Sequence, residues 1–446
     1  MATWPSVILI GQFILAFAEL SFVPSRVGAV TLVENATWKV DFAGFVEADS
    51  IWDSTRSLLG LAGNSPIARP GTSLGDLGRL HFSMRNSRLS FSMQSLTPTL
   101  GSLTNLGYLE LDFLGFDPQP VTNLNTEFSA TTSPTPRIRH AYGRVTWASG
   151  WELLVGQTWT LFGWGPNTFL STVSFAPVAG EVYERSPQIR LTKCLGSQNE
   201  RHPELAMAIL RPIQRDSGVP VVDLGARYVL PDWPLAYNLP TDLMVIRPSS
   251  FGISATFRDV AIPKPGVTQE QVHYPAGGLA LDAVFPVIAC RDALPHNCLS
   301  ATVELSSGFA LADLYTNWTG NLPQFALGAT TPNLDAGFGG FNSQGQFQLV
   351  GLSSGNASLQ YYFDTPQNPT YVSLGYAILS SQNAVHLQPA AGQVVYNQAE
   401  TLFSQIVRQW EGAVRGALEF SLFRSHYSDG VYALNYRLMT TFYYRF

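Results

Sequence analysis

The sequence predicts an all-β fold, a transmembrane antiparallel β-barrel that spans residues 37–446. Three observations support this prediction. Charged residues make up only 13% of the 446 residues and aromatic residues make up 12%, against roughly 25% charged residues in ordinary soluble domains. After the first twenty residues, no apolar run approaches the ~20 residues that a membrane helix needs. The C-terminal segment alternates between apolar and polar residues, which is typical of a half-buried strand.

Residues 1–29 are predicted to be a signal peptide. Val7–Ala18 form a short apolar stretch, and Val27–Ala29 fits the small-residue pattern of a cleavage site. No Lys or Arg precedes the apolar stretch, which departs from the usual export signal, and a single membrane anchor is the alternative. Residues 30–36 would then form a short periplasmic leader in front of the barrel.

The strongest strand signal lies at the C-terminus, in VYALNYRLMTTFYYRF. One face of this segment collects Leu434, Tyr436, Leu438, Thr440, Phe442, Tyr444 and Phe446. The other face collects Ala433, Asn435, Arg437, Met439, Thr441 and Arg445, with Tyr443 as an apolar exception. A final Phe446 behind alternating aromatic residues resembles the signal by which outer-membrane barrels are recognised for assembly. A soluble β-sandwich is the alternative.

Similar alternation recurs along the chain, between connections of unequal length. After residues 80–84 the phase slips at Asn86-Ser87 and resumes at Leu89, which predicts a β-bulge or a bend. The predicted external loops cover about 51–77, 115–134, 162–184 and 382–400. The predicted periplasmic turns lie near 95–102, 148–150, 196–201 and 410–412. Counts from the two ends disagree by one strand, so sixteen strands are predicted and eighteen are the alternative, because bacterial barrels have even numbers.

The charged side of each strand is predicted to face the lumen, because a Lys or Arg that faces lipid at the bilayer midplane costs ~2–4 kcal/mol. The basic and aromatic residues predicted to line the pore are Arg85, Arg88, His140, Tyr142, Arg144, Arg190, Arg415 and Arg437. The acidic ones are Asp41, Glu47, Glu110, Asp112 and Glu419. Rings of arginines favour anions in pores. The alternative is structural pairing across the barrel closure, with Arg437 and Arg415 neutralising Asp41 and Glu47.

Three cysteines are present. Cys290 and Cys298 lie eight residues apart in a polar connection and are predicted to form a disulfide in an oxidising compartment, with two free thiols as the alternative. Cys194 has no obvious partner. No His, Cys and carboxylate cluster has metal-ligand spacing, so neither a metal nor a cofactor is predicted. The net charge of −6 gives no reason to expect nucleic-acid binding.

Several segments in the first half of the barrel resemble a known family. RIRHAYGRVTW, GQTWTLF and ERSPQIRLT follow one another between residues 137 and 192, after FAGFVEADSIWDS, which ends at residue 54, and GRLHFSMRNSRLSF at 78–91. Their order and spacing are similar to those of the DcaP-like porins over roughly residues 38–195. The resemblance implies a sixteen-stranded, trimeric outer-membrane channel for small anionic solutes such as dicarboxylates. The periplasmic coiled coil of that family's best-known members has no room between Ala29 and Trp38.

The stretch 162–184 is unusually apolar for an external loop. Its large apolar residues are Phe162, Trp164, Phe169, Leu170 and Phe175. A large exposed apolar patch on a loop is unfavourable in water. We therefore expect this loop either to fold into the lumen as a constriction or to pack against a neighbouring subunit.

The function predicted from these observations is an outer-membrane porin, a passive diffusion channel for small anionic solutes. The alternatives are a transporter of hydrophobic compounds and a structural or adhesive barrel. Catalysis is not predicted. Nucleophilic hydrolysis needs an oriented Ser–His pair, and serines near the inward His81 and His140 are expected simply because serine is common in lumens. The expected partners are outer-membrane lipid and lipopolysaccharide, the barrel-assembly machinery through Phe446, and two further copies of the chain.

Overall fold

The structure of the protein is a computed structural model. It describes residues 29–446 except for 59–63, 98–100, 102–103, 116–134, 165–176, 213–217, 238–244, 265–269, 291–295, 316–317, 319–336, 364–368, 388–393 and 411–412. Almost all of the predicted signal peptide and most of the predicted loop at 115–134 therefore lie outside the described residues.

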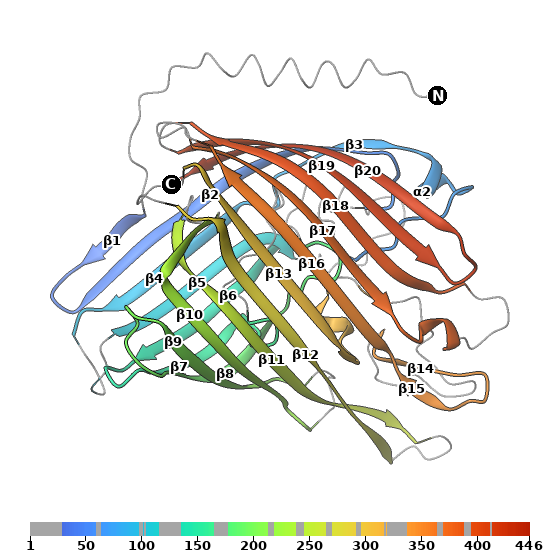
Figure 1. Ribbon diagram of the computed structural model, residues 1–446, viewed down its shortest axis with the longest axis horizontal. Coiled ribbons are helices and arrows are strands. Elements are labelled where there is room, and N and C mark those ends of the chain that lie inside the picture. The colour runs from blue at the N-terminus through green and yellow to red at the C-terminus, as the bar shows by residue number, and fades with distance from the viewer. Residues whose placement is uncertain are drawn as a thin grey trace.

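Long antiparallel strands form the wall of the molecule (Figure 1). They are β2 (Trp38–Asp53), β3 (Arg79–Ser83), β4 (Arg88–Ser95), β5 (Thr104–Gly115), β6 (Thr135–Thr146), β7 (Trp151–Trp159), β8 (Arg185–Cys194), β9 (His202–Leu210), β10 (Val221–Tyr237), β11 (Val245–Pro263), β12 (Gln271–Ile288), β13 (Cys298–Phe309), β16 (Gly351–Tyr362), β17 (Thr370–Ser381), β18 (Tyr396–Gln409), β19 (Val414–Tyr427) and β20 (Tyr432–Arg445).

The sheet closes into a barrel because β20 returns to pair with β2. β3 and β4 both pair with β2 and together make one broken strand. Counted in this way, the described residues contain sixteen barrel strands. The predicted fold class and the prediction of sixteen strands are confirmed, and the alternative of eighteen is wrong. The break between β3 and β4 coincides with the phase slip predicted at Asn86-Ser87.

Smaller elements accompany the barrel. β1 (Val30–Glu34) pairs with the first half of β2, so the residues expected to form a leader continue the sheet. β14 (Gly339–Phe341) and β15 (Phe347–Leu349) form a separate hairpin. The short helices are α2 (Ser73–Asp76), η2 (Ala312–Leu314) and η3 (Ala384–His386). Within the described residues, no helix has the length and apolar composition needed to span a membrane.

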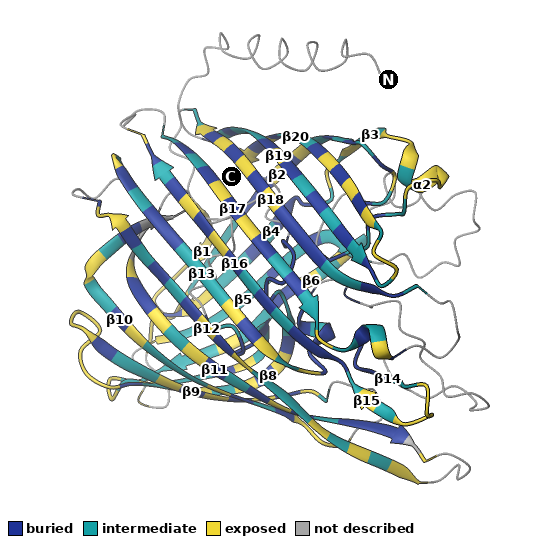
Figure 2. Cartoon of the chain, turned by 45° about the vertical axis from the view of Figure 1, so that its right-hand side comes forward, coloured by how far each residue is buried: buried dark blue, intermediate teal, exposed yellow. Residues whose placement is uncertain are grey.

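The last strand shows how the alternation in the sequence becomes two faces of a wall. Tyr436 and Phe442 are each 43% exposed, whereas Arg437 is 2% and Thr441 is 4% exposed. Figure 2 shows the same alternation of exposed and buried residues along the other strands. The terminal Phe446 exchanges two backbone hydrogen bonds with Gly44, of 2.9 and 3.0 Å, and so fixes the register at which the barrel closes.

The two ends of the barrel differ in the length of their connections. At the short-turn end, the connections include 147–150, 195–201 and 410–413. At the long-loop end, the connections include 54–78, 160–184, 310–350 and 382–395. Two predicted loop boundaries are corrected, because β2 continues to Asp53 and β18 already begins at Tyr396. The chain ends at the short-turn end, since β20 runs away from the turn at 428–431.

Candidate functional site: the barrel lumen

The outer and inner faces of the barrel have opposite chemistry. On β9, the outward Leu205 and Met207 are exposed, while the inward Ala206 and Ala208 are buried. Polar side chains are likewise buried on the inner face, as Arg437 of β20 illustrates. An apolar outer band around a polar interior is the arrangement of a barrel that sits in lipid and encloses a lumen.

The third long loop, residues 160–184, enters this lumen. We call it the constriction loop, and its described parts are 160–164 and 177–184. Its first part lies against the walls formed by β10 and β11. The backbone N–H of Phe162 donates to Asp223 Oδ2 at 3.2 Å, and that of Gly163 donates to Ser254 Oγ at 2.9 Å. The loop therefore leaves β7 and immediately crosses to strands further along the barrel.

The second part of the constriction loop reaches still more distant strands. The backbone N–H of Ala179 donates to Thr401 Oγ1 of β18 at 3.3 Å, and that of Val182 donates to Glu304 Oε1 of β13 at 2.9 Å. Since β18 lies far around the barrel from β7 and β8, the loop spans the lumen. The described parts of the loop therefore agree with the expectation that the apolar stretch folds into the lumen as a constriction. Phe169, Leu170 and Phe175 lie outside the described residues.

Gly180 lies close against the barrel wall. Its φ is +72°, a region that other L-residues rarely adopt. A Cβ atom there would lie 2.5 Å from the carbonyl oxygen of Ile378 and 2.8 Å from Cβ of Ser354. Its backbone N–H donates to Asn64 Oδ1 at 2.9 Å, which ties this loop to the first long loop.

Neighbouring loops pack around the constriction loop at the long-loop end. Their buried apolar side chains form one cluster that includes Leu58, Ile67, Leu161, Val178, Leu311, Leu314, Trp318 and Leu387. The Tyr427 hydroxyl donates to the carbonyl of Ile67 at 2.6 Å and the Tyr396 hydroxyl donates to that of Asn64 at 3.1 Å. The constriction loop is therefore held by other loops as well as by the barrel wall.

A network of arginines and carboxylates lines the wall beside the base of the constriction loop. Arg137 Nη2 lies 2.6 Å from Asp112 Oδ2, and Arg139 Nη1 lies 2.9 Å from the same oxygen. Arg139 Nε also donates to Glu110 Oε1 at 2.6 Å, and Arg88 Nη1 lies 3.8 Å from that oxygen. The predicted pore-lining Arg88, Glu110 and Asp112 are thus brought together, and all three are buried inside the barrel.

Arg137 and Arg139 were not predicted to line the pore, and a β-bulge explains why. In the pairing of β5 with β6, Glu110 lies opposite His140, whereas Leu111 lies opposite Ile138. Arg139 is therefore an extra residue, and both Arg139 and His140 turn inwards. Regular alternation cannot place both on one face. The sequence offered one energetic signal for the inward position of both arginines. An arginine on the lipid side is costly, and a β-bulge that turns its side chain inwards removes that cost.

Arg185 at the start of β8 extends the basic wall to the constriction loop. Its guanidinium lies 4.5 Å from the ring centroid of Trp159 and 5.4 Å from that of Tyr183. Burial favours the neutral phenol of Tyr183, but Arg139, Arg185 and Arg88 outweigh burial and hold the pKa of Tyr183 below its usual value. Three arginines therefore lie close enough to Tyr183 to favour its ionised form.

Carboxylates gather on the opposite side of the constriction loop. Asp223, Asp282 and Glu304 lie on β10, β12 and β13 and are buried or nearly so. In the loop itself, burial and then the neighbouring Glu304 raise the pKa of Glu181 well above its ordinary value. Burial, and after it Asp313, raise the pKa of Glu184 to about 7. The lumen therefore has an arginine-rich wall on one side of the constriction loop and a group of buried carboxylates on the other. Arg227 and Arg258, which pair with Glu204 and Asp313, lie on the strands of that second side.

Comparison with known structures identifies this architecture. The structure aligns with the outer membrane channel DcaP of Acinetobacter baumannii at a TM-score of 0.62 and 16% sequence identity, over 94% of this chain and 100% of that chain. The chain has the fold of an outer-membrane channel. The predicted resemblance is confirmed for the fold, and with its apolar outer surface this fold places the chain in the bacterial outer membrane.

Two further structures align at lower TM-scores. They are an anion-selective porin from Comamonas acidovorans, with a TM-score of 0.49, 10% identity and coverage of 92% and 100% of the two chains, and OprB of Pseudomonas putida, with 0.48, 10% and coverage of 91% and 94%. No family model matches the chain, and no curated protein matches it either.

Arg85 and Arg190, two predicted pore-lining residues of this channel-like barrel, bind neutral acceptors. Arg85 Nε donates to the carbonyl of Phe113 at 3.2 Å. Arg190 Nε donates to Gln188 Oε1 at 2.9 Å, and its Nη2 donates to the carbonyl of Trp159. Among the described residues, no carboxylate lies within 4.0 Å of either guanidinium. Their positive charge therefore has no adjacent counter-charge in the described part of the wall.

The other predicted residues of β6 also face inwards. His140 is buried, and its Nδ1 lies 3.0 Å from Thr158 Oγ1. The ring centroids of Tyr142 and Tyr108 lie 5.6 Å apart. Arg144 is more exposed, and its Nε lies 3.8 Å from an oxygen of Glu152 on the next strand. These three positions follow the predicted face.

In the alternative of structural pairing across the closure, the pairing of Arg437 with Asp41 is wrong. Arg437 donates to both oxygens of Asp53, at 2.8 and 2.9 Å, because β2 and β20 place these residues opposite each other. Asp41 lies beyond the closure of the barrel at Gly44. It accepts a hydrogen bond from Thr31 of β1 at 2.7 Å and lies 3.3 Å from Lys39 Nζ. Asp41 therefore belongs to the β1–β2 extension and does not line the closed pore.

The alternative pairing of Arg415 with Glu47 does not occur among the described contacts. Glu47 is buried and accepts a hydrogen bond from Asn86 Nδ2 at 3.2 Å. Arg415 lies 5.6 Å from the centroid of an inward tyrosine ring of β20. Its Nη2 has no hydrogen-bond partner among the residues that the structure describes. The buried Glu419 accepts a hydrogen bond from Ser421 on its own strand at 2.5 Å.

The structure joins Cys290 and Cys298 by a disulfide, with Cα atoms 5.0 Å apart. The bridge spans the connection between β12 and β13 at the short-turn end. This is the pairing that the spacing in the sequence predicts.

Proposed function

We propose that the chain is a passive diffusion channel and that its pore favours small anionic solutes, in particular those with carboxylate groups. The observation that carries the proposal is the course of the constriction loop, which crosses the lumen beside a wall rich in arginine. The guanidinium group matches carboxylates in geometry as well as in charge. A solute that passes between the loop and this wall meets guanidinium donors on the side of the wall.

The balance of charge on this wall supports an anion preference. The wall from β3 to β8 is rich in inward arginines, which include Arg85, Arg88, Arg137, Arg139, Arg185 and Arg190. Arg79 and Arg144 on the same wall lie 4.0 Å from Asp53 and 3.8 Å from Glu152. Glu110 and Asp112 form ion pairs with three of the inward arginines, Arg88, Arg137 and Arg139. Charge acts over about a Debye length, ~8 Å at physiological salt. A constriction brings solutes within that range, whereas a wide lumen would not.

Transport of hydrophobic compounds is a second candidate function. The buried apolar cluster of loops at the long-loop end favours it. The buried arginines and carboxylates of the wall oppose it, because an apolar solute gains nothing from them and would have to pass them without hydrogen bonding. For solutes of equal size, an anion channel would pass anionic solutes faster than apolar ones, whereas a transporter of hydrophobic compounds would pass apolar solutes faster.

A liposome-swelling assay tests the proposal. Succinate, butane-1,4-diol and butane-1,4-diamine have similar size and differ in charge, so their relative entry rates report selectivity. We expect succinate to enter fastest, and the Arg85→Ala, Arg190→Ala double variant to reduce this advantage. Arg88 is left in place, because it is buried against Glu110. Arg201→Ala, which removes an exposed ion pair with Asp232, is the matched control. Faster entry of the diamine would refute the proposal.

We further propose that three copies assemble, as the resemblance to the DcaP-like porins implies, in contact with outer-membrane lipid and lipopolysaccharide. Insertion through the assembly machinery would depend on Phe446, whose backbone pairs with Gly44 at the closure. Sedimentation of the purified protein in detergent measures the number of copies. A monomeric mass at all concentrations would contradict the proposed trimer.

A further inference from the structure

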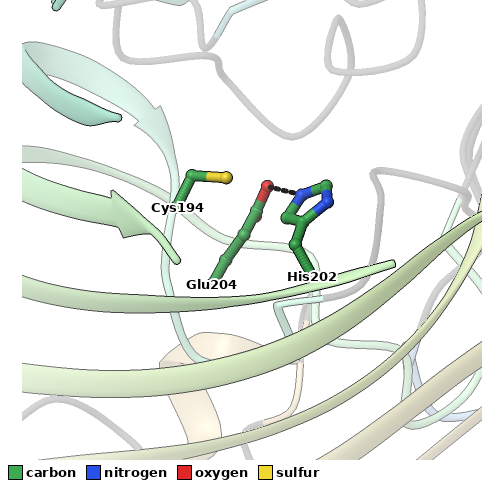
Figure 3. Close-up of side chains that lie close together, drawn as sticks. All are labelled: Cys194, His202 and Glu204. Atoms are coloured by element: carbon green, nitrogen blue, oxygen red, sulfur yellow. Dashed lines mark hydrogen bonds and ion pairs between the residues drawn. The ribbon is translucent and has the colours of Figure 1, made fainter. Parts of the chain in front are cut away.

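Three potential metal ligands converge on the hairpin formed by β8 and β9, on the inner face of the barrel at the short-turn end. Cys194 is the last residue of β8 and lies directly opposite Glu204 of β9. His202 lies two residues before Glu204 and therefore on the same face of its strand. Their ligand atoms all lie within 4.8 Å of one another. Figure 3 shows the sulfur, the carboxylate and the imidazole side by side.

Hydrogen bonding fixes which nitrogen of His202 is free to bind a metal. Nδ1 lies 2.8 Å from the backbone carbonyl of Glu200. A carbonyl can only accept, so Nδ1 carries a proton. In the neutral ring Nε2 then presents its lone pair, and it faces Glu204 Oε1 at 3.3 Å. Donation of the second ring nitrogen to a carbonyl is a typical outer-shell interaction of metal-binding histidines.

The distance between these two atoms fits a shared metal ion. Nitrogen and oxygen ligands at ~2.0–2.1 Å from zinc in a tetrahedral arrangement lie about 3.3 Å apart. The same distance separates His202 Nε2 from Glu204 Oε1. Two lone pairs that face each other repel unless a proton or a cation lies between them.

Arg227 holds the other carboxylate oxygen of Glu204. Its Nε lies 3.1 Å from Oε2, and its Nη2 also donates to that atom. This contact leaves Oε1 directed at His202 and orients the carboxylate as an outer-shell partner would. Arg227 also lies 4.5 Å from the ring centroid of Trp164 in the constriction loop. The ligand cluster is therefore connected to the constriction of the channel through one side chain.

We propose that Cys194, His202 and Glu204 bind one divalent metal ion of the zinc class. Thiolate, imidazole and carboxylate are the ligands that zinc prefers, and three protein ligands leave a fourth position for water or a solute in the lumen. The Cys194 thiol now lies 3.6 Å from the carbonyl of Gly196. It loses its proton to solvent as the sulfur–metal bond forms, so metal binding releases one proton and weakens as the pH falls.

The cluster differs from the other histidine–carboxylate contacts of the described chain because it includes sulfur. His273 Nδ1 lies 2.7 Å from Asp259 Oδ2 at an exposed position. Among the described residues, no cysteine joins this pair in a cluster of metal ligands. The chain has three cysteines, and two of them form the disulfide. A metal–thiolate signal from the oxidised protein must therefore come from Cys194.

Titration of the purified, oxidised protein with Co²⁺, followed by competition with Zn²⁺, tests the proposal. We expect one Co²⁺ per chain, a thiolate-to-cobalt charge-transfer band in the near ultraviolet, and loss of that band when Zn²⁺ displaces the cobalt. Cys194→Ser should abolish the band. His202→Gln should weaken Zn²⁺ binding by at least the ~10–100-fold that loss of an outer-shell partner costs. His273→Gln is the control and should leave both measurements unchanged.

The result that would overturn the proposal is equally specific. If Zn²⁺ fails to bind the folded wild-type barrel, or if Cys194→Ser and His202→Gln bind it as tightly as the wild type does, the cluster is a contact between His202 and Glu204 and is not a metal site. Heat-modifiable migration in gels establishes that each variant is folded before titration. The outcome is independent of solute selectivity, because stoichiometry is measured without a membrane.

Discussion

Substitution of Gly180 by Ala should release the constriction loop from the barrel wall and enlarge the pore. The backbone at this position has φ of +72°, and a Cβ atom would lie 2.5 Å from the carbonyl oxygen of Ile378. Backbone atoms of a strand cannot move aside as a flexible side chain can. The loop must therefore shift away from β16 and β17.

The cost of this substitution follows from the contacts that would be lost. Left-handed backbone costs a residue with a Cβ roughly 1–2 kcal/mol. The shift also breaks the hydrogen bonds from Gly180 to Asn64 and from Ala179 to Thr401, each with a net value of ~0.5–1.5 kcal/mol. The loss of these two hydrogen bonds alone should shift the equilibrium from the loop bound to the wall towards the loop detached from it. At 1.4 kcal/mol for each factor of ten, the shift is roughly 5–150-fold.

Single-channel conductance in planar bilayers measures this shift. The Gly180→Ala channel should populate a state of higher conductance than the wild type. Gly430→Ala is the control, because Gly430 has a φ of +81° with open space around it and so carries the backbone strain without the clash. A folded Gly180→Ala channel with the wild-type conductance distribution would refute the assigned course of the constriction loop.

Three further predictions concern charge and stability. Burial and a neighbouring aspartate raise the pKa of Glu184 to about 7. Its carboxylate therefore loses charge when the pH falls from ~8 to ~6, and the anion preference of the channel should rise over that range. An equal rise in the Glu184→Gln variant would contradict this prediction. Arg437→Ala leaves the buried Asp53 without its bidentate partner and should lower the free energy of unfolding by ~3 kcal/mol in urea titrations followed by gel mobility, whereas an unchanged midpoint would argue against the closing pair. Replacing Cys290 and Cys298 by Ala removes the disulfide that closes a short loop and should lower the free energy of unfolding by ~2–3 kcal/mol. A reductant should cause the same loss of stability in the wild type.

The fold could be predicted because alternation is a direct consequence of strand geometry. Successive side chains of a strand point to opposite faces, so a wall between lipid and water imposes a period of two on the sequence. Residues 431–446 show that period, and the structure places Tyr436 outside and Arg437 inside. The break between β3 and β4 was also visible, because the phase of the alternation slips at Asn86-Ser87.

The detailed pairing of charges could not be predicted, because it depends on register. Arg139 turns inwards through a β-bulge, and one inserted residue reverses the face of every residue that follows. The partner of Arg437 is Asp53 and not Asp41, because β2 extends beyond the closure and pairs there with β1. Alternation identifies the face of a residue but contains no information about its neighbour on the next strand.

The loop contacts and the ligand cluster could not be predicted from the sequence either, because they too depend on which strands and residues become neighbours. The apolar character of residues 162–184 predicts that the loop avoids water, but it does not specify that Ala179 reaches Thr401 on a distant strand. Cys194 lies eight residues from His202, outside the usual metal-ligand spacings. Only the register of β8 with β9 brings the two side chains to one face of a hairpin.

The sign of the reversal potential under a KCl gradient tests the central claim most directly. The account predicts that the wild-type channel is more permeable to chloride than to potassium, because Arg85 and Arg190 add positive charge without an adjacent carboxylate in the described wall. Replacing both by Ala should move the reversal potential towards zero, with the barrel still folded. A wild-type channel that prefers potassium, or a double variant with an unchanged reversal potential, would contradict the account.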